Sequence, residues 1–224
     1  MPSGHRLIIF GRQGAGKGTQ CERLAAHYEV PHVSTGDMLR AAVRDGTAFG
    51  LKAKEYMDAG KLLPDDIMVG LVAERLGQPD AIRGWLLDGF PRTTGQAEAL
   101  AEVTADAPVD VAVNLDVPES VVVERISSRR VCSNCGAIYS TSRPPTNPWV
   151  CDRCGGEVVQ RADDTEEAVR TRLADYQAQT APLIEWFDAR GLLVTVDGNA
   201  DPDTVFGRIV SQVDEAMARS GAAD

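Results

Sequence analysis

No stretch of the 224-residue sequence approaches the roughly 18 consecutive apolar residues that a membrane-spanning helix needs. Residues 1–10 also lack the apolar length of a secretory signal peptide. We therefore expect a cytoplasmic protein without a membrane partner. A chain of this length can bury a full core, either as one domain or as one domain that carries insertions.

Positive charge is in short supply as well. The chain has 23 Lys and Arg against 33 Asp and Glu, which gives a formal net charge of -10 at pH 7. General binding to nucleic acid or to an anionic membrane relies on surplus Lys and Arg, so we expect neither partner. An acidic protein can still bind phosphate groups, but it must then gather its arginines in one place.

Cysteine is scarce and odd in number, with five residues in all. Four of them follow the spacing C-x2-C-x15-C-x2-C, which is typical of a zinc site in a reducing compartment, although iron accepts the same ligands. Disulfides would leave an odd thiol. Four thiolates fill a tetrahedral shell and leave no position for water or substrate, so the site is predicted to be structural. The predicted metal ligands are Cys132, Cys135, Cys151 and Cys154.

Two glycines and the fifth cysteine complete this pattern. Gly136 and Gly155 each follow the second cysteine of a pair, where the chain must turn sharply around a metal. Cys21 lies in the helix expected after the first strand, and we expect it to be a small buried residue.

Short apolar runs alternate with longer helical patterns along the chain. Units of this kind build a parallel sheet that is buried on both faces, so the predicted fold class is α/β with a five-stranded sheet flanked by helices. The predicted strands lie at residues 6–10, 30–34, 85–90, 111–117 and 192–196. The predicted helices lie at residues 17–28, 36–45, 48–59, 65–76, 94–104, 118–129, 165–189 and 202–219, with helix starts marked by Asp65, Asp164-Thr165 and Asp201-Pro202.

Two stretches interrupt this alternation of strand and helix. Residues 34–63 hold two helical patterns with no strand between them, and residues 127–164 hold the four cysteines. We expect both to project from the ligand edge of a core made of residues 1–33, 64–126 and 165–224. The segment 127–164 is too small to bury a useful core, so a metal ion that ties its arms together is a sensible substitute.

The segment GRQGAGKGT at residues 11–19 follows the first predicted strand and opens the first predicted helix, as a phosphate-binding P-loop does. Its glycines let backbone N–H groups turn toward phosphate oxygens, and Lys17 supplies a cation. Gly18 stands where the strict pattern has the Ser or Thr that ligates Mg²⁺. An acid elsewhere must then help to hold the ion. Asp88 is the best placed, and Asp37 is a second candidate.

Several longer motifs occur in one order along nearly the whole chain: GKGTQ, STGDMLR at 34–40, DGFPRT at 88–93, RISSRR at 125–130, QRADD at 160–164, VRTRL at 169–173 and TAPLI at 180–184. With them the sequence resembles adenylate kinase of the long-lid bacterial type with a four-cysteine zinc-binding lid. The resemblance implies a P-loop core, an AMP-binding insertion at 34–63, called the acceptor insertion below, and a zinc-binding lid at 127–164, called the lid segment. It also implies transfer of the terminal phosphoryl group from Mg-ATP to AMP, giving two ADP.

The resemblance implies two nucleotide sites and one catalytic cluster. The ATP site would use Gly14, Ala15, Gly16, Lys17, Gly18, Thr19, Arg125, Arg129, Ile138, Tyr139 and Ala200. The AMP site would use Thr35, Arg40, Lys61, Leu62, Leu63, Gly89, Phe90, Pro91, Arg92, Gln96, Arg161 and Arg172. The catalytic residues would be Lys17, Asp88, Arg92, Arg129, Arg161 and Arg172, with Mg²⁺ entering on ATP and Zn²⁺ in the lid.

Such a reaction needs alignment rather than a general base, because a phosphomonoester with a second pKa near ~6 is already largely ionised at neutral pH. Forked, permanently charged guanidinium groups suit the alignment of two polyanions. His5, His27 and His32 lie outside the phosphate motifs, and we expect no catalytic role for them. Both projecting segments are expected to close over the substrates and exclude water.

One departure from the family concerns the P-loop, which reads Gln13 where proline is usual, beside an unusual Arg12. The glycines and Lys17 are retained, so we expect the cradle to persist and the rigidity of the loop to differ. The resemblance also implies a cis Phe90–Pro91 peptide bond. We expect a monomer, since no exposed heptad pattern occurs.

Two alternatives stay open. The protein could be a different nucleoside monophosphate kinase, or one that uses GTP as donor, and only turnover with a panel of nucleotides separates these. A zinc-ribbon nucleic-acid-binding module that uses ATP as a regulator would need a basic ribbon. Residues 131–164 contain no lysine and more acids than arginines, which disfavours that alternative.

Overall fold

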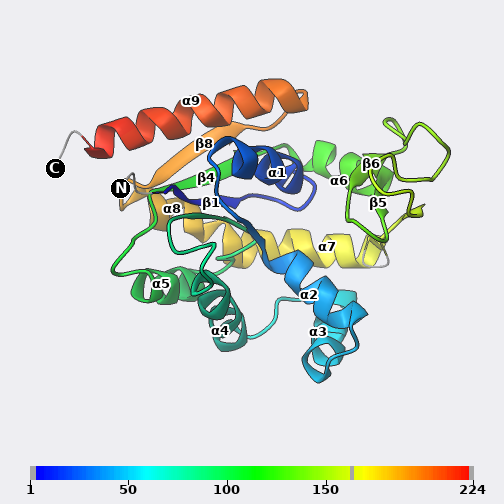
Figure 1. Ribbon diagram of the computed structural model, residues 1–224, viewed down its shortest axis with the longest axis horizontal. Coiled ribbons are helices and arrows are strands. Elements are labelled where there is room, and N and C mark those ends of the chain that lie inside the picture. Colours follow the sequence, from blue (N-terminus) through cyan, green and yellow to red (C-terminus); the bar gives the residue numbers. More distant parts are fainter. Residues whose placement is uncertain (1–3, 162–163, 222–224) are drawn as a thin grey trace.

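A five-stranded parallel sheet forms the centre of the computed structural model, which describes residues 4–161 and 164–221 (Figure 1). Its strands run in the order β2-β3-β1-β4-β8, and every neighbouring pair is parallel. The predicted α/β fold class is therefore confirmed. The strands are β1 (Arg6–Phe10), β2 (His32–Ser34), β3 (Trp85–Asp88), β4 (Val111–Asp116) and β8 (Leu193–Asp197).

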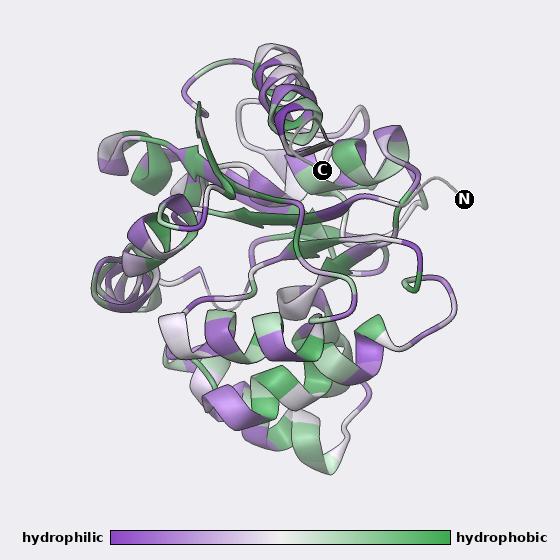
Figure 2. Cartoon of the chain, turned by 90° about the vertical axis from the view of Figure 1, so that its left-hand side faces the viewer, coloured by the Kyte–Doolittle hydropathy of each residue, from purple (hydrophilic) through white to green (hydrophobic). Residues whose placement is uncertain are grey.

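Alternate residues of the sheet pack into two hydrophobic cores on its opposite faces. Leu7 and Ile9 of β1 belong to one core, whereas Ile8 and Phe10 belong to the other. The first core includes residues of α1 (Lys17–His27), α6 (Glu119–Ser128) and α9 (Pro202–Gly221), and the second includes residues of α2 (Thr35–Arg44), α4 (Asp65–Leu76), α5 (Thr94–Val103) and α8 (Pro182–Asp188). A strand buried on both faces reads as a continuous apolar run, which is why these segments were recognisable in the sequence. Figure 2 shows helices above and below the sheet.

The helices begin and end within about two residues of their predicted bounds, with one exception. Side-chain oxygens of Ser34, Thr47, Thr93 and Thr165 accept the backbone N–H three residues further on and fix four of the starts. In the described part of the chain no helix is both long and apolar enough to span a bilayer. The helices are α1 (Lys17–His27), α2 (Thr35–Arg44), α3 (Ala48–Asp58), α4 (Asp65–Leu76), α5 (Thr94–Val103), α6 (Glu119–Ser128), α7 (Glu166–Asp175), α8 (Pro182–Asp188) and α9 (Pro202–Gly221).

The prediction of one helix over residues 165–189 is wrong. A π-helical turn, Tyr176–Thr180, separates α7 from α8, and the Ala181 N–H donates to the Tyr176 carbonyl at 2.8 Å. Pro182 lacks an N–H and cannot continue the α-helical ladder, so it begins a new helix. The turn places the Thr180 hydroxyl 2.8 Å from the carbonyl oxygen of Arg92, at the edge of the sheet where ligands are expected.

The acceptor insertion consists mainly of α2 and α3, which pack against each other beside the sheet, at the lower right of Figure 1. The two helices approach closely because residue 50 is glycine. A Cβ atom there would lie 2.0 Å from the Ala42 carbonyl oxygen.

The lid segment folds as a small antiparallel sheet at the right of Figure 1, an arrangement that the sequence analysis did not foresee. Its strands, in the order β6-β5-β7, are β5 (Arg129–Cys132), β6 (Ile138–Ser140) and β7 (Val158–Val159). Among the described residues of the lid segment, Cys132, Ala137, Cys151 and Val158 form a small buried core. So small a core cannot by itself stabilise a fold.

Candidate functional site

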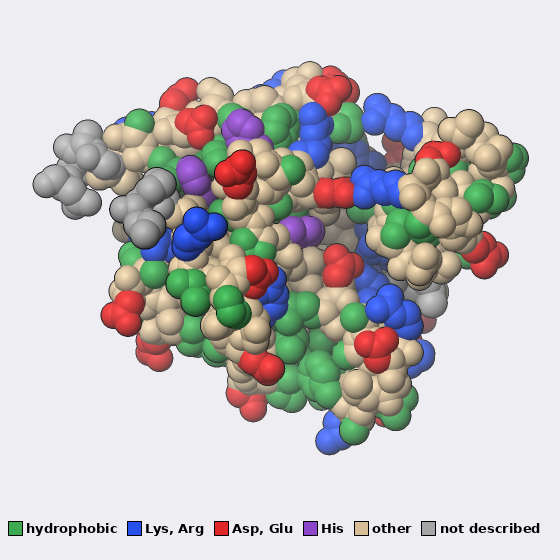
Figure 3. Space-filling view, viewed as in Figure 1, with side chains coloured by type: hydrophobic (Ala, Val, Ile, Leu, Met, Phe, Trp, Pro, Cys, Tyr) green, Lys and Arg blue, Asp and Glu red, His purple; other side chains and the backbone are tan. Residues whose placement is uncertain are grey.

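A cleft of about 1280 Å³ opens between the P-loop, the acceptor insertion and the lid segment. Figure 3 shows this face of the molecule hollowed toward the lid segment, with Lys and Arg side chains in and around the hollow. An acidic chain thus concentrates cations at one place, as phosphate binding requires. The basic residues predicted to act there all line the cleft: Lys17, Arg40, Arg92, Arg125, Arg129, Arg161 and Arg172.

The P-loop connects the carboxyl end of β1 to the N-terminus of α1. Gly14 and Gly16 have φ angles of 82° and 103°, which an L side chain rarely adopts. A Cβ atom on Gly14 would also lie 2.8 Å from Ile126 of α6. No side chain caps the N-terminus of α1, so its first N–H groups remain available to an anion.

Lys17 is partly buried at the start of α1, beside this loop. Its ammonium group donates to the carbonyl oxygens of Gly11 and Arg12 at 2.8 and 2.9 Å. Burial lowers the pKa of Lys17 to about 8, although the nearby Asp88 carboxylate acts in the opposite direction. Lys17 is therefore held on neutral acceptors, and the negative charge of a phosphate group would stabilise its protonated form.

Asp88 ends β3 at the cleft, and His32 of the neighbouring strand lies beside it. The His32 Nε2 atom is 3.3 Å from Asp88 Oδ2. Cys21 of α1 brings its thiol to the same place, so that the three donor atoms lie within 4.8 Å of one another. Burial raises the pKa of the Cys21 thiol, which agrees with the small buried residue predicted there. The contact of His32 with Asp88 is not predictable from the sequence, because no motif joins the two residues.

The carboxylate of Asp88 is better placed than that of Asp37 to help hold Mg²⁺. A Cβ atom at Gly18 would lie 4.0 Å from Asp88 Oδ2, so this oxygen reaches the position where common P-loops carry their hydroxyl. Asp37 is instead paired with Arg40 at 2.6 Å. Although burial acts to raise the pKa of Asp37, the Arg40 guanidinium holds it below its usual range. Carboxylate oxygens are the hard ligands that Mg²⁺ prefers.

The residues expected to bind the acceptor meet at the end of β3. The Arg92 Nε atom donates to the Gly89 carbonyl at 2.7 Å, and the Gln96 side chain accepts from the Arg92 N–H at 2.8 Å. The Thr35 hydroxyl donates to the Gly89 carbonyl at 3.0 Å. Burial lowers the pKa of Arg92. Also lining this part of the cleft are Arg40, Lys61, Leu62, Leu63 and Pro91.

Phe90 departs from this arrangement. Its side chain is almost fully buried in the hydrophobic core below the sheet and does not line the cleft. The Phe90–Pro91 peptide bond is cis, as expected. Phe90 thus belongs to the DGFPRT motif, but its side chain contributes to the hydrophobic core and not to the cleft.

The opposite half of the cleft gathers the residues expected to bind ATP. Arg125 of α6 donates to the carbonyl oxygens of Ala15 and Gly198 at 3.1 and 3.2 Å, which fixes its guanidinium beside the P-loop. Ile138 of the lid segment approaches Gly18, where a Cβ atom would lie 3.4 Å from its Cδ1. The other expected residues on this side also line the cleft: Gly14, Gly16, Thr19, Arg129, Tyr139 and Ala200.

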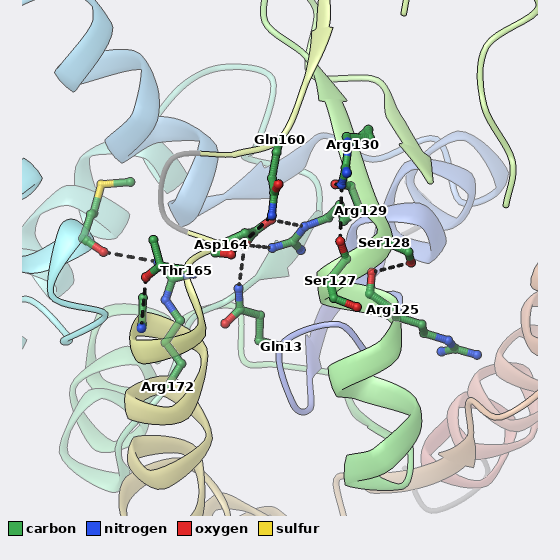
Figure 4. A network of polar contacts seen from close by, with 12 residues as sticks. Gln13, Arg125, Ser127, Ser128, Arg129, Arg130, Gln160, Asp164, Thr165 and Arg172 are labelled. Atoms are coloured by element: carbon green, nitrogen blue, oxygen red, sulfur yellow. Dashed lines mark hydrogen bonds and ion pairs between the residues drawn. The ribbon is translucent and has the colours of Figure 1, made fainter. Parts of the chain in front are cut away.

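An ion pair joins the two ends of the lid segment (Figure 4). Arg129 donates through both Nε and Nη2 to the carboxylate of Asp164, with Nε 2.9 Å from Oδ2. The Asp164 side chain is fully buried and that of Arg129 is 14% exposed. Sequence reasoning gave Asp164 only the start of a helix. The acidic pair that ends QRADD was the available signal, but its partner lies 35 residues away.

The four cysteine thiols of the lid segment converge as the zinc prediction requires. All four sulfur atoms lie within 4.8 Å of one another, and the pairs Cys132–Cys154 and Cys135–Cys151 are each 3.5 Å apart. Thiolates bound at about 2.3 Å to one tetrahedral zinc lie roughly 3.8 Å from each other. All five cysteines are free thiols, so the disulfide alternative is excluded.

The two knuckles around these thiols have the predicted geometry. Gly136 and Gly155 have φ angles of 75° and 71°. The Tyr139 hydroxyl donates to the Cys151 sulfur at 3.4 Å and lowers the pKa of that thiol to about 6. Stabilised thiolate at this position favours a metal ligand.

Comparison with known proteins gives one consistent result. The family model described as adenylate kinase matches residues 9–192. An adenylate kinase of Methanosarcina barkeri is 52% identical over 206 residues, which cover 91% of this chain and 95% of the relative. One of Desulfitobacterium hafniense is 49% identical over 93% of this chain and 98% of the relative. One of Bacillus subtilis is 48% identical over 91% and 95%.

Proposed function

The chain belongs to the adenylate kinase family, and we propose that it transfers the terminal phosphoryl group of Mg-ATP reversibly to AMP, giving two ADP. It is accordingly a phosphotransferase of the nucleoside monophosphate kinase class. The main observation that supports this reaction is the cleft. Although the protein is acidic overall, Lys17 and the predicted arginines, which come from the core, the acceptor insertion and the lid segment, all line it.

Each substrate is assigned to one half of the cleft. The ATP phosphates are proposed to lie on the P-loop N–H groups and Lys17, with Arg125 and Arg129 above them. AMP is proposed to lie between the acceptor insertion and β3, on Arg40, Arg92 and the amide of Gln96. The proposed division is a core of residues 1–33, 64–126 and 165–224, with 34–63 covering AMP and 127–164 covering ATP.

The proposed chemistry is alignment and charge stabilisation. The ionised acceptor phosphate attacks directly, and the guanidinium groups of Arg92, Arg161 and Arg172 neutralise the charge that spreads over the transferred group. Asp88 would help to hold Mg²⁺ together with water and the ATP phosphates, and the ion would supply positive charge against the phosphate groups. None of the three histidines is required as a base.

The metal of the lid segment is proposed to be a structural zinc. Cys132, Cys135, Cys151 and Cys154 would complete its coordination shell, so it takes no part in phosphoryl transfer. The proposal extends to a monomer in the cytoplasm.

Turnover with a panel of nucleotides tests the function. ATP and GTP are offered as donors, and AMP, GMP, CMP and UMP as acceptors, all with Mg²⁺. We expect ATP with AMP to give the highest kcat/KM, and Arg92→Lys to reduce it because a single ammonium cannot replace a forked contact. A preference for another acceptor or for GTP would assign the chain to a different kinase specificity.

A further inference from the structure

Gln13 lies in the middle of the P-loop, and its side-chain amide reaches the place where both ends of the lid segment meet α7 (Figure 4). The amide faces three charged groups, namely the carboxylate of Asp164 and the guanidinium groups of Arg129 and Arg172. Neighbouring glycines supply the unusual backbone angles of the loop. Residue 13 therefore does not have to be a glycine, and its side chain can make polar contacts.

The orientation of this amide follows from its surroundings. If the amide nitrogen faces these three charged groups, Gln13 donates to Asp164 Oδ1 at 3.4 Å, which is long for a hydrogen bond. With the oxygen there instead, Gln13 accepts from Arg129 Nη2 at 3.1 Å and from Arg172 Nη1 at 2.7 Å. Two charge-assisted hydrogen bonds outweigh one long contact, and Asp164 already accepts from Arg129. The carbonyl oxygen therefore faces both guanidinium groups.

These contacts connect the P-loop to both projecting segments. Arg129 is paired with Asp164, so holding Arg129 also holds the other end of the lid segment. Arg172 Nη2 donates to the carbonyl oxygen of Met57, at the end of α3 in the acceptor insertion, at 3.3 Å. One neutral oxygen in the P-loop is thus the point to which the lid segment, α7 and the acceptor insertion are joined.

We propose that Gln13 is a positioning residue, whose amide oxygen holds Arg129 and Arg172 at the P-loop before nucleotides bind. The inference rests on the proposed function, because it gives these arginines the role of aligning the phosphates. A neutral acceptor suits the task, since it orients a guanidinium group without competing with phosphate as strongly as a carboxylate would. Preorganised arginines act on the reaction step rather than on substrate affinity alone.

The first test compares Gln13→Met with Arg12→Met. Methionine matches the length of glutamine and lacks the amide. Arg12 lies in the same loop, but its side chain points to Asp116 and the Val117 carbonyl, which makes it the matched control. We expect Gln13→Met to lower kcat about tenfold while KM for ATP and AMP changes less than about twofold. For Arg12→Met we expect kcat and KM each to change by less than about threefold.

The second test measures coupling with Arg172. In an Arg172→Lys background the additional effect of Gln13→Met on kcat should be clearly smaller, because one of the two contacts through which Gln13 acts, the shorter one, is already lost. In an Arg40→Lys background the effect should persist in full, since Arg40 pairs with Asp37 and is not among the described partners of Gln13. Equal losses in both backgrounds, a change in KM without a change in kcat, or wild-type kcat in Gln13→Met would each overturn the proposal.

A third measurement separates this inference from the proposed reaction. Urea unfolding midpoints of the nucleotide-free wild type, Gln13→Met, Arg172→Lys and the double variant form a cycle that reports the contact itself. If the midpoint change of the double variant differs from the sum of the changes of the two single variants, the contact is supported even if ATP and AMP prove to be the wrong substrates. Additive midpoints refute it, whatever the wild-type enzyme turns over.

Discussion

Lys17 provides a test in which stability and activity change in opposite directions. Its side chain is partly buried, its ammonium group donates to the carbonyl oxygens of Gly11 and Arg12, and its pKa falls from 10.5 to about 8. The shift of roughly 2.5 units corresponds to about 3 kcal/mol at 1.36 kcal/mol per unit. Replacing Lys17 by Met removes this buried charge and forfeits two hydrogen bonds of about 1 kcal/mol each.

The sign of the pH dependence follows from the direction of the shift. The folded pKa of Lys17 lies below the unfolded value, so between about pH 8 and pH 10.5 the unfolded chain binds more protons. Raising the pH through this window stabilises the folded state. Below pH 8 the folded wild type carries the full cost of the buried charge, whereas Lys17→Met has no such group at any pH.

The assay is urea unfolding of the nucleotide-free protein from pH 7 to pH 10.5. At pH 7 we expect Lys17→Met to be more stable than wild type by roughly 1–2 kcal/mol, although it cannot transfer phosphoryl groups. Toward pH 10.5 the wild type should gain about 3 kcal/mol relative to the variant. Lys54→Met, at a lysine whose side chain is 53% exposed, is the control and should keep the pH dependence of the wild type.

Two results would refute this reasoning. If the stability difference between wild type and Lys17→Met stays constant from pH 7 to pH 10.5, burial does not lower the pKa of Lys17. If the Lys54→Met control shows the same relative change as Lys17→Met, the pH dependence comes from other groups and does not report Lys17.

Three further outcomes are expected. Mild chelation should lower the unfolding temperature in calorimetry, and zinc-free protein that is folded but inactive would contradict a structural metal. Asp164→Asn should cost about 3–5 kcal/mol in urea unfolding because Arg129 is left buried without its anion, whereas the same change at the exposed Asp203 should have little effect; equal losses would refute the difference in burial. Gly14→Ala should raise KM for ATP, because its φ of 82° and the nearby α6 exclude a methyl group, whereas Gly207→Ala, with open space around it, should not.

The parts of the site that could be predicted from the sequence are those built from residues close to one another along the chain. A P-loop is one continuous segment, and the cysteine spacing places two ligands on each of two sharp turns, so both could be recognised without knowing the fold. The strands were recognisable because a doubly buried strand is an unbroken apolar run. The arginines were found through motifs, and the cleft gathers all of them.

The features that escaped prediction depend on distant residues or on very short elements. The strands of the lid segment have two to four residues, too few for a period to emerge. His32 and Asp88 meet only because β2 and β3 are neighbours in the sheet. The break after α7 depends on how Pro182 is accommodated, and a helical pattern that continues across it conceals the interruption.

The cations of the cleft differ in what holds them before a nucleotide binds, and this difference makes one more prediction. Lys17, Arg92 and Arg125 donate to neutral backbone carbonyls, which phosphate oxygens displace at little cost.

Arg129 is instead paired with the buried carboxylate of Asp164, so its positive charge is already partly neutralised before ATP binds. Asp164 therefore stabilises the fold and opposes nucleotide binding. We expect Asp164→Asn to lower KM for ATP while KM for AMP, bound in the other half of the cleft, stays unchanged; a raised KM for ATP would show that Asp164 instead holds Arg129 in its binding position.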